Sequence, residues 1–444
     1  MSGVYFVSLG CPKNLVDTEV LAGILLQKGY NITFDAKEAD IYLINTCAFL
    51  PSAREEASDM IQKAVNWKKR ARRRSRRIVV AGCLPQYKES DLFRERFPDV
   101  DIWLGVNDIP RIAEILEAGK IAYTANPSYL YDHNTARLQL TVPHMAYLKI
   151  ADGCNNCCTY CAIPHIRGRL RTRTQTSVIQ EAVNLINNGV KELVVIAQDV
   201  TAFGHDRPES GESLSSLLKE MDNLDGDFKI RLLYTHPAHY TDELIECIRD
   251  SKHVMHYLDM PLQHISERIL QEMNRHVTQK RVKEVISILR SEIPDIVLRT
   301  TFITGFPGET EAEFEELKEF IKEVKFERCG VFPYSAEPGT KAAEMPGQID
   351  FETACRRADE LMEIQLGIMA EYQQSMVGRE IEVLADDVEG TRAIGRGVAD
   401  APEIDNMVVF GGRKMKAGEF YTVRIEAVSD YDLIGHVTRM ENKK

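Results

Sequence analysis

The chain has 444 residues, of which 44% are hydrophobic and 27% charged, a balance typical of a soluble globular protein rather than a disordered one. Its 55 Lys and Arg against 67 Asp and Glu give a net charge of −12, which argues against non-specific nucleic-acid binding by the chain as a whole. No apolar run approaches the ~18 residues of a membrane span, and the N-terminus lacks the pattern of a signal peptide. We therefore expect a cytoplasmic protein with no membrane partner and, from its length, two to four domains.

The first 123 residues alternate short apolar runs with helical patterns. The runs cover residues 4–9, 41–46, 78–82 and 102–105, and helical patterns at 16–27, 53–69 and 91–97 lie between them. This alternation predicts an α/β domain with a parallel sheet covered on both faces. A cysteine follows each of the first three strands: Cys11, Cys47 and Cys83. Because the carboxyl ends of parallel strands share one edge of a sheet, these three thiols are expected to converge.

A basic run, KKRARRRSRR, occupies residues 68–77 between a predicted helix and a predicted strand. One interpretation is a solvated loop. The other is an electrostatic contact with ribosomal RNA or another polyanion.

Residues 124–145 carry two prolines and little periodicity, so we interpret them as a linker. The following segment, 146–376, repeats strand and helix patterns, with strands expected at 146–151, 192–197, 229–234, 255–260, 297–304 and 329–334. Helices are expected at 177–188, 242–249, 280–291, 311–324 and 351–374. Six β/α repeats predict a closed or partly closed barrel with its active site at the strand C-termini. Residues 377–444 have short strands with glycine-rich turns and predict a small antiparallel β-barrel.

Four cysteines crowd into eight residues at the end of the first barrel strand: Cys154, Cys157, Cys158 and Cys161. Four thiolates in so short a loop would fold it too severely for a zinc site, which usually joins two separated knuckles. The spacing C-x3-C-x2-C through Cys154, Cys158 and Cys161 suits a 4Fe-4S cube with one iron lacking a thiolate. A structural metal site is the alternative, and Cys157 has no assigned role.

This motif after the first barrel strand resembles that of the radical S-adenosylmethionine superfamily. The resemblance implies that the open iron binds S-adenosylmethionine and that one electron cleaves it to a radical that abstracts hydrogen from carbon. Further similarities at strand ends imply cofactor contacts by Gln198, Gln263, Ile303, Gly305 and Glu309. The alternative is that these glycines turn the chain and these glutamines satisfy polar groups of the barrel.

The order of the three segments is similar to that of the methylthiotransferases, which combine an N-terminal three-cysteine domain (here 1–123), a radical barrel (146–376) and a small TRAM barrel (377–444). The resemblance implies a second 4Fe-4S cluster on Cys11, Cys47 and Cys83. It also implies that this cluster carries the sulfur and that an external donor supplies electrons. Buried structural thiols are the alternative interpretation. The remaining cysteines are expected in the core: Cys247, Cys329 and Cys355.

The segment SLGCPKNLVDTE (8–19) resembles the branch of this family that modifies the β-carbon of an aspartate in small-subunit ribosomal protein S-twelve, free or within the small subunit. The other branch acts on transfer RNA adenosine and usually has glutamine, methionine and asparagine after the first cysteine. The tail from Val377 has 13 acidic and 10 basic residues, a net charge of −3, which suits a basic protein partner better than RNA. We expect Asp400, Glu403 and Asp405 to face that partner. The transfer RNA enzyme and an iron–sulfur electron-transfer protein are the alternatives.

Overall fold

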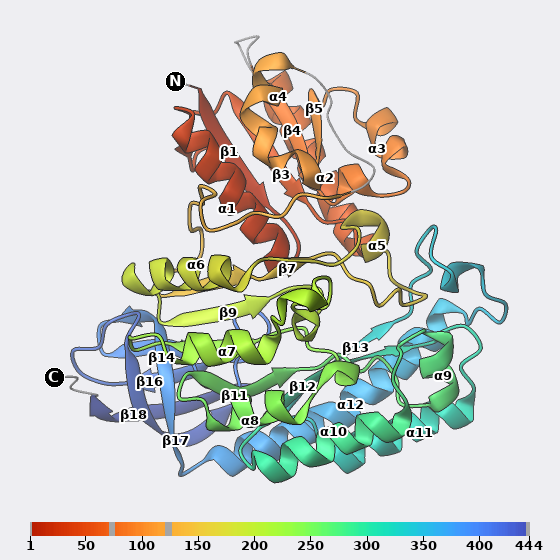
Figure 1. Cartoon of the computed structure of the whole chain (residues 1–444), viewed down its shortest axis with the longest axis vertical. Coiled ribbons are helices and arrows are strands. Elements are labelled where there is room, and N and C mark those ends of the chain that lie inside the picture. The colour runs from red at the N-terminus through yellow and green to blue at the C-terminus, as the bar shows by residue number, and fades with distance from the viewer. Residues whose placement is uncertain (1, 71–75, 120–126, 441–444) are drawn as a thin grey trace.

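The computed structural model describes residues 2–70, 76–119 and 127–440, which form three units in chain order (Figure 1). The N-terminal unit has a sheet of five parallel strands in the order β2-β1-β3-β4-β5. These strands are β1 (Gly3–Ser8), β2 (Asn31–Thr33), β3 (Ile41–Thr46), β4 (Arg77–Gly82) and β5 (Ile102–Gly105). The prediction of a parallel α/β sheet is confirmed, although the short edge strand β2 was not predicted.

Helices cover both faces of this sheet, as expected. They are α1 (Pro12–Gln27), α2 (Pro51–Lys69), α3 (Ser90–Arg96) and α4 (Ile112–Ala118). Side chains alternate along β3, so that Leu43 packs in the core that contains α1 and α4, whereas Ile44 packs in the core that contains α2. A proline in the first turn begins both α1 and α2, where its missing N–H costs nothing.

The middle unit has six parallel strands in the order β13-β12-β11-β10-β9-β6. They are β6 (Met145–Lys149), β9 (Glu192–Ile196), β10 (Lys229–Leu232), β11 (Val254–Asp259), β12 (Val297–Thr304) and β13 (Arg328–Pro333). Strands β6 and β13 are the two edges, so the barrel is partial. The short strands β7 (Ala151–Asp152) and β8 (Arg171–Thr172) form a separate antiparallel pair.

Helices pack on the outer face of the middle sheet, where they form the largest core of the molecule. They include α6 (Gln175–Asn187), α7 (Leu214–Asp222), α8 (Asp242–Asp250), α9 (Glu267–Glu272), α10 (Gln279–Glu292), α11 (Glu311–Val324) and α12 (Phe351–Met376), with the short α5 (Ile163–Ile166) in the cysteine loop. Helices α7 and α9 were not predicted. The long α12 leads from the middle unit to the C-terminal unit, as Figure 1 shows.

The C-terminal unit is a closed barrel in the order β14-β15-β16-β18-β17. Its strands are β14 (Glu380–Glu389), β15 (Arg392–Arg396), β16 (Val408–Gly411), β17 (Phe420–Ser429) and β18 (Asp432–Met440). The prediction of a small antiparallel β-barrel is confirmed, with the one difference that β16 and β18 pair in parallel. A ring of five strands cannot alternate direction throughout, so closing it requires one parallel pair.

The loop between β15 and β16 docks the C-terminal barrel onto the middle sheet. Asp400 is buried and forms a 2.9 Å ion pair with Arg328, and Asp405 accepts a 2.8 Å hydrogen bond from Tyr257. The expectation that Asp400 and Asp405 face a partner protein is therefore wrong. Both carboxylates lie inward because arginines on the strands of the middle unit would otherwise be buried without counter-charges. Glu403 alone of the three remains exposed.

The segment that we interpreted as a linker has no helix or strand between residue 127 and Met145, but it is bound to both neighbouring units. Arg137 forms ion pairs of 2.6 Å with Glu19 of α1 and 2.7 Å with Glu181 of α6. The basic run at 68–77 lies partly outside the described residues. No helix in the described part of the chain is both long and apolar enough to span a bilayer.

Candidate functional site

The structure brings Cys11, Cys47 and Cys83 together at one end of the N-terminal sheet. Each follows a strand, β1, β3 or β4 respectively, and the thiols interact electrostatically with one another. Gly10 adopts φ +87°, and a β-carbon there would lie 2.5 Å from Cβ of Cys47. Glycine is therefore required for the two cysteine-bearing loops to approach so closely.

Burial raises the pKa of the Cys83 thiol to about 12, and it raises the pKa of Cys47 as well. The guanidinium of Arg167 opposes this effect at Cys83, to which its Nη2 donates a 3.3 Å hydrogen bond. Iron binds the thiolate, so loading a cluster here must displace protons. The donor set, three thiols beside one buried cation, fits a cluster with three protein ligands.

The second group of thiols lies in the loop after β7. Backbone N–H groups point at two sulfurs of this loop, from Asn156 to Sγ of Cys154 at 3.4 Å and from Ile163 to Sγ of Cys161 at 3.5 Å. Arg275 Nη1 lies 3.5 Å from Sγ of Cys158. Each sulfur of the predicted triad therefore receives one donor, which is the environment that stabilises cluster thiolates.

Burial raises the pKa of the Cys154 thiol to about 11 and that of the Cys161 thiol to about 12. Repulsion from the Cys158 thiolate adds to the rise in the pKa of both Cys154 and Cys161. Crowded thiols of this kind are well suited to bind a cluster, because the iron accepts their charge.

Cys157 differs from its three neighbours. It is exposed and has a positive φ of 50°, and its carbonyl accepts a 3.0 Å hydrogen bond from Nδ2 of Asn274. A cavity of about 780 Å³ opens on this side of the loop, lined in part by Cys157, Asn155 and His165. This left-handed residue lets the chain turn between Cys154 and Cys158, which supports the C-x3-C-x2-C interpretation.

A buried ion network joins the two cysteine sites. Arg167, six residues after Cys161, pairs with Asp17 of α1 at 2.6 Å and with Asp152 at 3.1 Å. Lys149 of β6 contacts the same two carboxylates. Sequence patterns did not indicate Arg167, because its partners are distant in sequence and come from two units.

Lys13 is a third cation beside this network, in the first turn of α1. Its side chain is buried, and Nζ lies 3.2 Å from the centroid of the Tyr234 ring. Burial lowers the pKa of this ammonium, whereas the neighbouring Cys11 raises it. Tyr234 follows β10 and adopts φ 64°, so Lys13 and Tyr234 meet where the N-terminal and middle units face each other.

The five residues expected to contact the cofactor lie at the C-terminal ends of three strands. Gln198 follows β9, Gln263 follows β11, and the other three lie at or just after the end of β12. Gln198 donates a 2.8 Å hydrogen bond to Asp152, while its buried carbonyl oxygen has no partner among the described residues. Gln263 has φ 73° and pairs through its backbone with β12. Ile303 packs against the same apolar cluster as Tyr160 of the cysteine loop. The strand ends therefore adjoin that loop.

Glu309 has a different environment. Its side chain is fully buried, and its carboxylate accepts hydrogen bonds of 2.6 Å from the Gly305 amide and 2.7 Å from Arg357. It also pairs with His264 at 3.1 Å. These bonds fix the turn at Gly305, which has φ 72° and no room for a β-carbon.

A carboxylate and two imidazoles, Asp199, His236 and His239, lie within 4.8 Å of one another beside the cysteine loop. Burial lowers the pKa of His236 well below its ordinary value. Burial alone would raise the pKa of Asp199, but the hydrogen bond with His239 and the nearby imidazoles bring it below the usual range. The sequence analysis missed this group because its members follow two different strands.

Three family descriptions match the chain. Residues 3–105 match "Uncharacterized protein family UPF0004", residues 148–321 match "Radical SAM superfamily" and residues 377–438 match "TRAM domain". The first covers the sheet that carries Cys11, Cys47 and Cys83, and the second begins in β6, ahead of the cysteine loop.

Curated relatives match over almost the whole chain. A protein from Geotalea uraniireducens named "Ribosomal protein uS12 methylthiotransferase RimO" is 44% identical over 98% of this chain and 98% of its own length. A protein of the same name from Pelotomaculum thermopropionicum is 45% identical over 97% of this chain and 98% of its own.

Solved structures share the fold at low identity. The radical S-adenosylmethionine methyltransferase TsrM from Kitasatospora setae, solved with cobalamin and a 4Fe-4S cluster, has a TM-score of 0.55 at 12% identity and covers 75% of each chain. The radical enzyme OxsB, solved with aqua-cobalamin and S-adenosylmethionine, has a TM-score of 0.52 at 13% identity and covers 84% of this chain and 56% of its own.

Proposed function

The chain belongs to the family of ribosomal protein uS12 methylthiotransferases, and from this premise we propose that it attaches a methylthio group to the β-carbon of an aspartate in uS12, the small-subunit ribosomal protein S-twelve. It is a radical S-adenosylmethionine methylthiotransferase with two 4Fe-4S clusters. The observation that carries the proposal is that Arg167 connects two separate sets of three cysteines, one in each unit.

We propose that Cys154, Cys158 and Cys161 bind the radical cluster and that the auxiliary cluster binds to the N-terminal set, Cys11, Cys47 and Cys83. When bound, the radical cluster supplies the electron that cleaves S-adenosylmethionine, and the auxiliary cluster supplies the sulfur. The protein contributes donors to the sulfurs, through Asn156, Ile163 and Arg275, and a fixed spacing between the sites. Preorganised donors of this kind cost no rearrangement during the reaction.

We propose that Gln198, Gln263, Ile303 and Gly305 line the S-adenosylmethionine site. The free carbonyl oxygen of Gln198 supports this assignment, because a buried acceptor without a partner is costly unless a ligand satisfies it. Glu309 was expected to contact the cofactor directly. Its carboxylate instead accepts a hydrogen bond from the Gly305 amide, which supports a role in holding the turn that lines the site.

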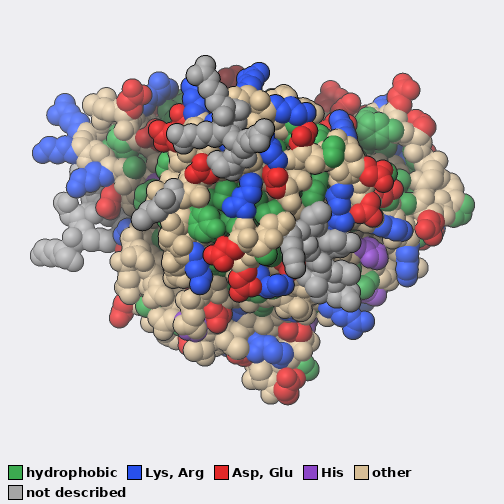
Figure 2. All heavy atoms as spheres, turned by 90° about the horizontal axis from the view of Figure 1, so that it is seen from above, with side chains coloured by type: hydrophobic (Ala, Val, Ile, Leu, Met, Phe, Trp, Pro, Cys, Tyr) green, Lys and Arg blue, Asp and Glu red, His purple; other side chains and the backbone are tan. Residues whose placement is uncertain are grey.

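We propose that the protein partner is uS12, either free or within the small subunit. An external donor would supply the electrons, and the reaction would take place in the cytoplasm. Contact with ribosomal RNA is supported by a cavity of about 520 Å³ in the N-terminal unit, lined by Trp67 and Asn66 and by the cations Lys37, Lys63, Arg70 and Arg76. In the view of Figure 2 positive and negative side chains are otherwise interspersed. A local contact of this kind is compatible with an acidic protein.

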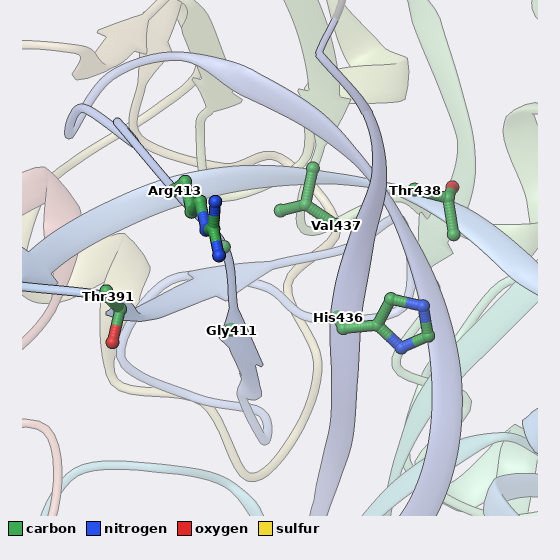
Figure 3. Close-up of a pocket in the computed structure, with 7 residues that line it drawn as sticks. Thr391, Gly411, Arg413, His436, Val437 and Thr438 are labelled. Atoms are coloured by element: carbon green, nitrogen blue, oxygen red, sulfur yellow. The ribbon is translucent and has the colours of Figure 1, made fainter.

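The C-terminal barrel matches the TRAM domain, which supports a second surface for RNA, although its net charge of −3 led us to expect a basic protein partner instead. The barrel has a pocket of about 580 Å³. Figure 3 shows the side chains that line it, among them Arg413, Thr391, His436 and Thr438. His436 already pairs with Glu426 at 2.9 Å, so Arg413 is the cation best placed to meet a phosphate.

The test is anaerobic reconstitution with iron and sulfide, followed by incubation with S-adenosylmethionine, reductant and purified uS12. Mass spectrometry should find one methylthio group in place of a hydrogen on an aspartate of uS12. Modification of transfer RNA adenosine instead, or failure to release 5′-deoxyadenosine, would contradict the proposal.

A further inference from the structure

Lys13 has no carboxylate partner of its own. Its side chain is only 8% exposed, and within residues 2–70, 76–119 and 127–440 no hydrogen bond or ion pair joins Nζ to another group. The centroid of the Tyr234 ring lies 3.2 Å from Nζ. A buried ammonium held only by a cation–π contact is unusual, because burial of a charge normally requires an ion pair.

The acids around Lys13 are committed to other cations. Asp152 pairs with Arg167 at 3.1 Å and with Lys149 at 3.4 Å. Asp259 pairs with Arg299 at 2.8 Å and accepts a 3.1 Å hydrogen bond from the Tyr234 amide.

The charges of this region therefore do not balance. Lys149 and Arg167 share the two carboxylates of Asp17 and Asp152, and Lys13 adds a third cation without a third acid, so that 3 − 2 leaves one positive charge in excess among these side chains. The excess belongs to Lys13, since the other two cations have short ion pairs.

We propose that the ammonium of Lys13 binds the side-chain carboxylate of the substrate aspartate. This inference rests on the proposed function and identifies the group that recognises the reacting residue. Lys13 lies two residues after Cys11, so a carboxylate held by Nζ is held beside the auxiliary site.

The chemistry of aspartate makes this anchor effective. Its β-carbon is bonded directly to the carboxylate carbon, so fixing the carboxylate leaves the β-carbon little freedom. Small displacements of a reacting carbon cost large factors in rate, and a charge-assisted hydrogen bond is among the stronger restraints that a protein can provide. The ring of Tyr234, from the middle unit, contacts the ammonium at 3.2 Å and thereby holds the anchor at the face between the two units.

The test combines one substitution in the enzyme with one in the substrate. Lys13→Met removes the charge at similar length, and the matching uS12 has Asn in place of the target Asp. Wild-type enzyme should bind the Asp form about 10- to 100-fold more tightly than the Asn form, the range of a hydrogen bond between charged groups. Lys13→Met should bind the two forms equally and about as tightly as the wild type binds the Asn form, whereas a general loss of structure would also weaken binding of the Asn form.

Cofactor chemistry serves as the second readout. Lys13→Met should retain the electron paramagnetic resonance signals of both reduced clusters, the iron content and the KM for S-adenosylmethionine in cofactor cleavage. Lys28→Met, at the exposed end of the same helix, is the matched control and should bind both forms of uS12 as the wild type does.

Three results would overturn the inference. The first is equal binding of the Asp and Asn forms of uS12 by the wild-type enzyme. This measurement needs no enzyme variant, so it remains valid even if Lys13→Met fails to fold. An unchanged preference for Asp in Lys13→Met would overturn the inference as well. A raised KM for S-adenosylmethionine would show that the carboxylate bound there is that of the cofactor. Methylthiolation of the Asp form by the wild type tests the proposed function separately.

Discussion

Asn156, in the loop that carries the radical-site cysteines, donates a 2.9 Å hydrogen bond to the Asp199 carboxylate. Asp199 follows β9, so this bond ties the cysteine loop to the end of a neighbouring strand. The same carboxylate accepts a hydrogen bond from Thr201 and pairs with His239 at 3.1 Å. Asp199 is thus a supporting residue that holds the loop in position.

Asp199→Asn should weaken the radical site without removing any thiol. The amide keeps the size of the carboxylate but replaces one acceptor by a donor, so one of the bonds to Asn156 or His239 is lost, at a cost of about 1.5–3 kcal/mol. Iron retained per chain after desalting, and the rate of cofactor cleavage, should both fall. Asp250→Asn, at an exposed pair with Arg249, is the control and should leave both unchanged. Normal iron retention in Asp199→Asn would refute the supporting role.

Substitutions in the cysteine loop should distinguish Cys157 from its neighbours. Cys157→Ala should keep the radical cluster, because this side chain is exposed and lies outside the C-x3-C-x2-C triad. Cys158→Ala should lose the cluster and cofactor cleavage, because a ligand is removed. The measurements are iron content and 5′-deoxyadenosine release. Cluster loss in Cys157→Ala with retention in Cys158→Ala would reverse the assignment.

Replacing Cys11, Cys47 and Cys83 together with Ala should separate the two halves of the chemistry. Iron per chain should fall by about half, since one of two four-iron clusters is lost. Cofactor cleavage should continue while methylthiolation of uS12 stops. Cys247→Ala, a buried cysteine far from both sites in the fold, controls for the loss of thiol volume. Unchanged iron in the triple variant would mean that these thiols are structural.

Arg167→Ala should destabilise the contact between the N-terminal and middle units. The substitution removes one of the two cations that pair with the buried carboxylates of Asp17 and Asp152. Removing one partner of a buried ion pair lowers the free energy of unfolding by about 3–5 kcal/mol. Urea unfolding should show the loss. Arg249→Ala, whose pairs with Asp250 and Glu292 are exposed, should leave the free energy of unfolding almost unchanged, because water screens such pairs. Similar costs for the two variants would show that the buried network contributes little.

Asp400→Ala should loosen the C-terminal barrel from the middle unit, because it leaves Arg328 buried with a weaker partner. Limited proteolysis after α12 should become faster, and the unfolding midpoint should fall. Glu389→Ala removes an exposed carboxylate of β14 in the same barrel and should change neither. Truncation before Val377 removes Asp400 as well and leaves Arg328 without this partner. The middle unit should therefore lose stability when the C-terminal barrel is deleted.

The sequence predicted most of the fold because its signals are local. Periodicity and turn residues located β3 and α11 at their exact bounds, and the strand-end positions of Cys11, Cys47 and Cys83 followed from the rules of parallel sheets. Strand β2 was missed because three residues carry too little pattern to recognise.

Contacts between units could not be predicted in this way. Asp400 and Asp405 read as surface acids because a carboxylate in a turn is usually solvated, and only the structure shows the arginines that draw them inward. Arg167 and Lys13 were overlooked for a similar reason. Their significance depends on which charges remain unpaired after folding, and that is a property of three-dimensional packing.

The docking of the C-terminal barrel has a consequence for the order of synthesis. Arg396 pairs with Glu192, which is 204 residues earlier and fully buried together with Arg231. A ribosome that has released the middle unit has not yet released Arg396, since domains emerge N-terminal first at about 5–20 residues per second. Arg396 is 20 residues beyond Met376, the end of α12, so Glu192 and Arg231 remain without this partner for about 1–4 s after the middle unit has emerged. During that interval two buried charges of the sheet are exposed to water, until the last domain folds onto the start of β9.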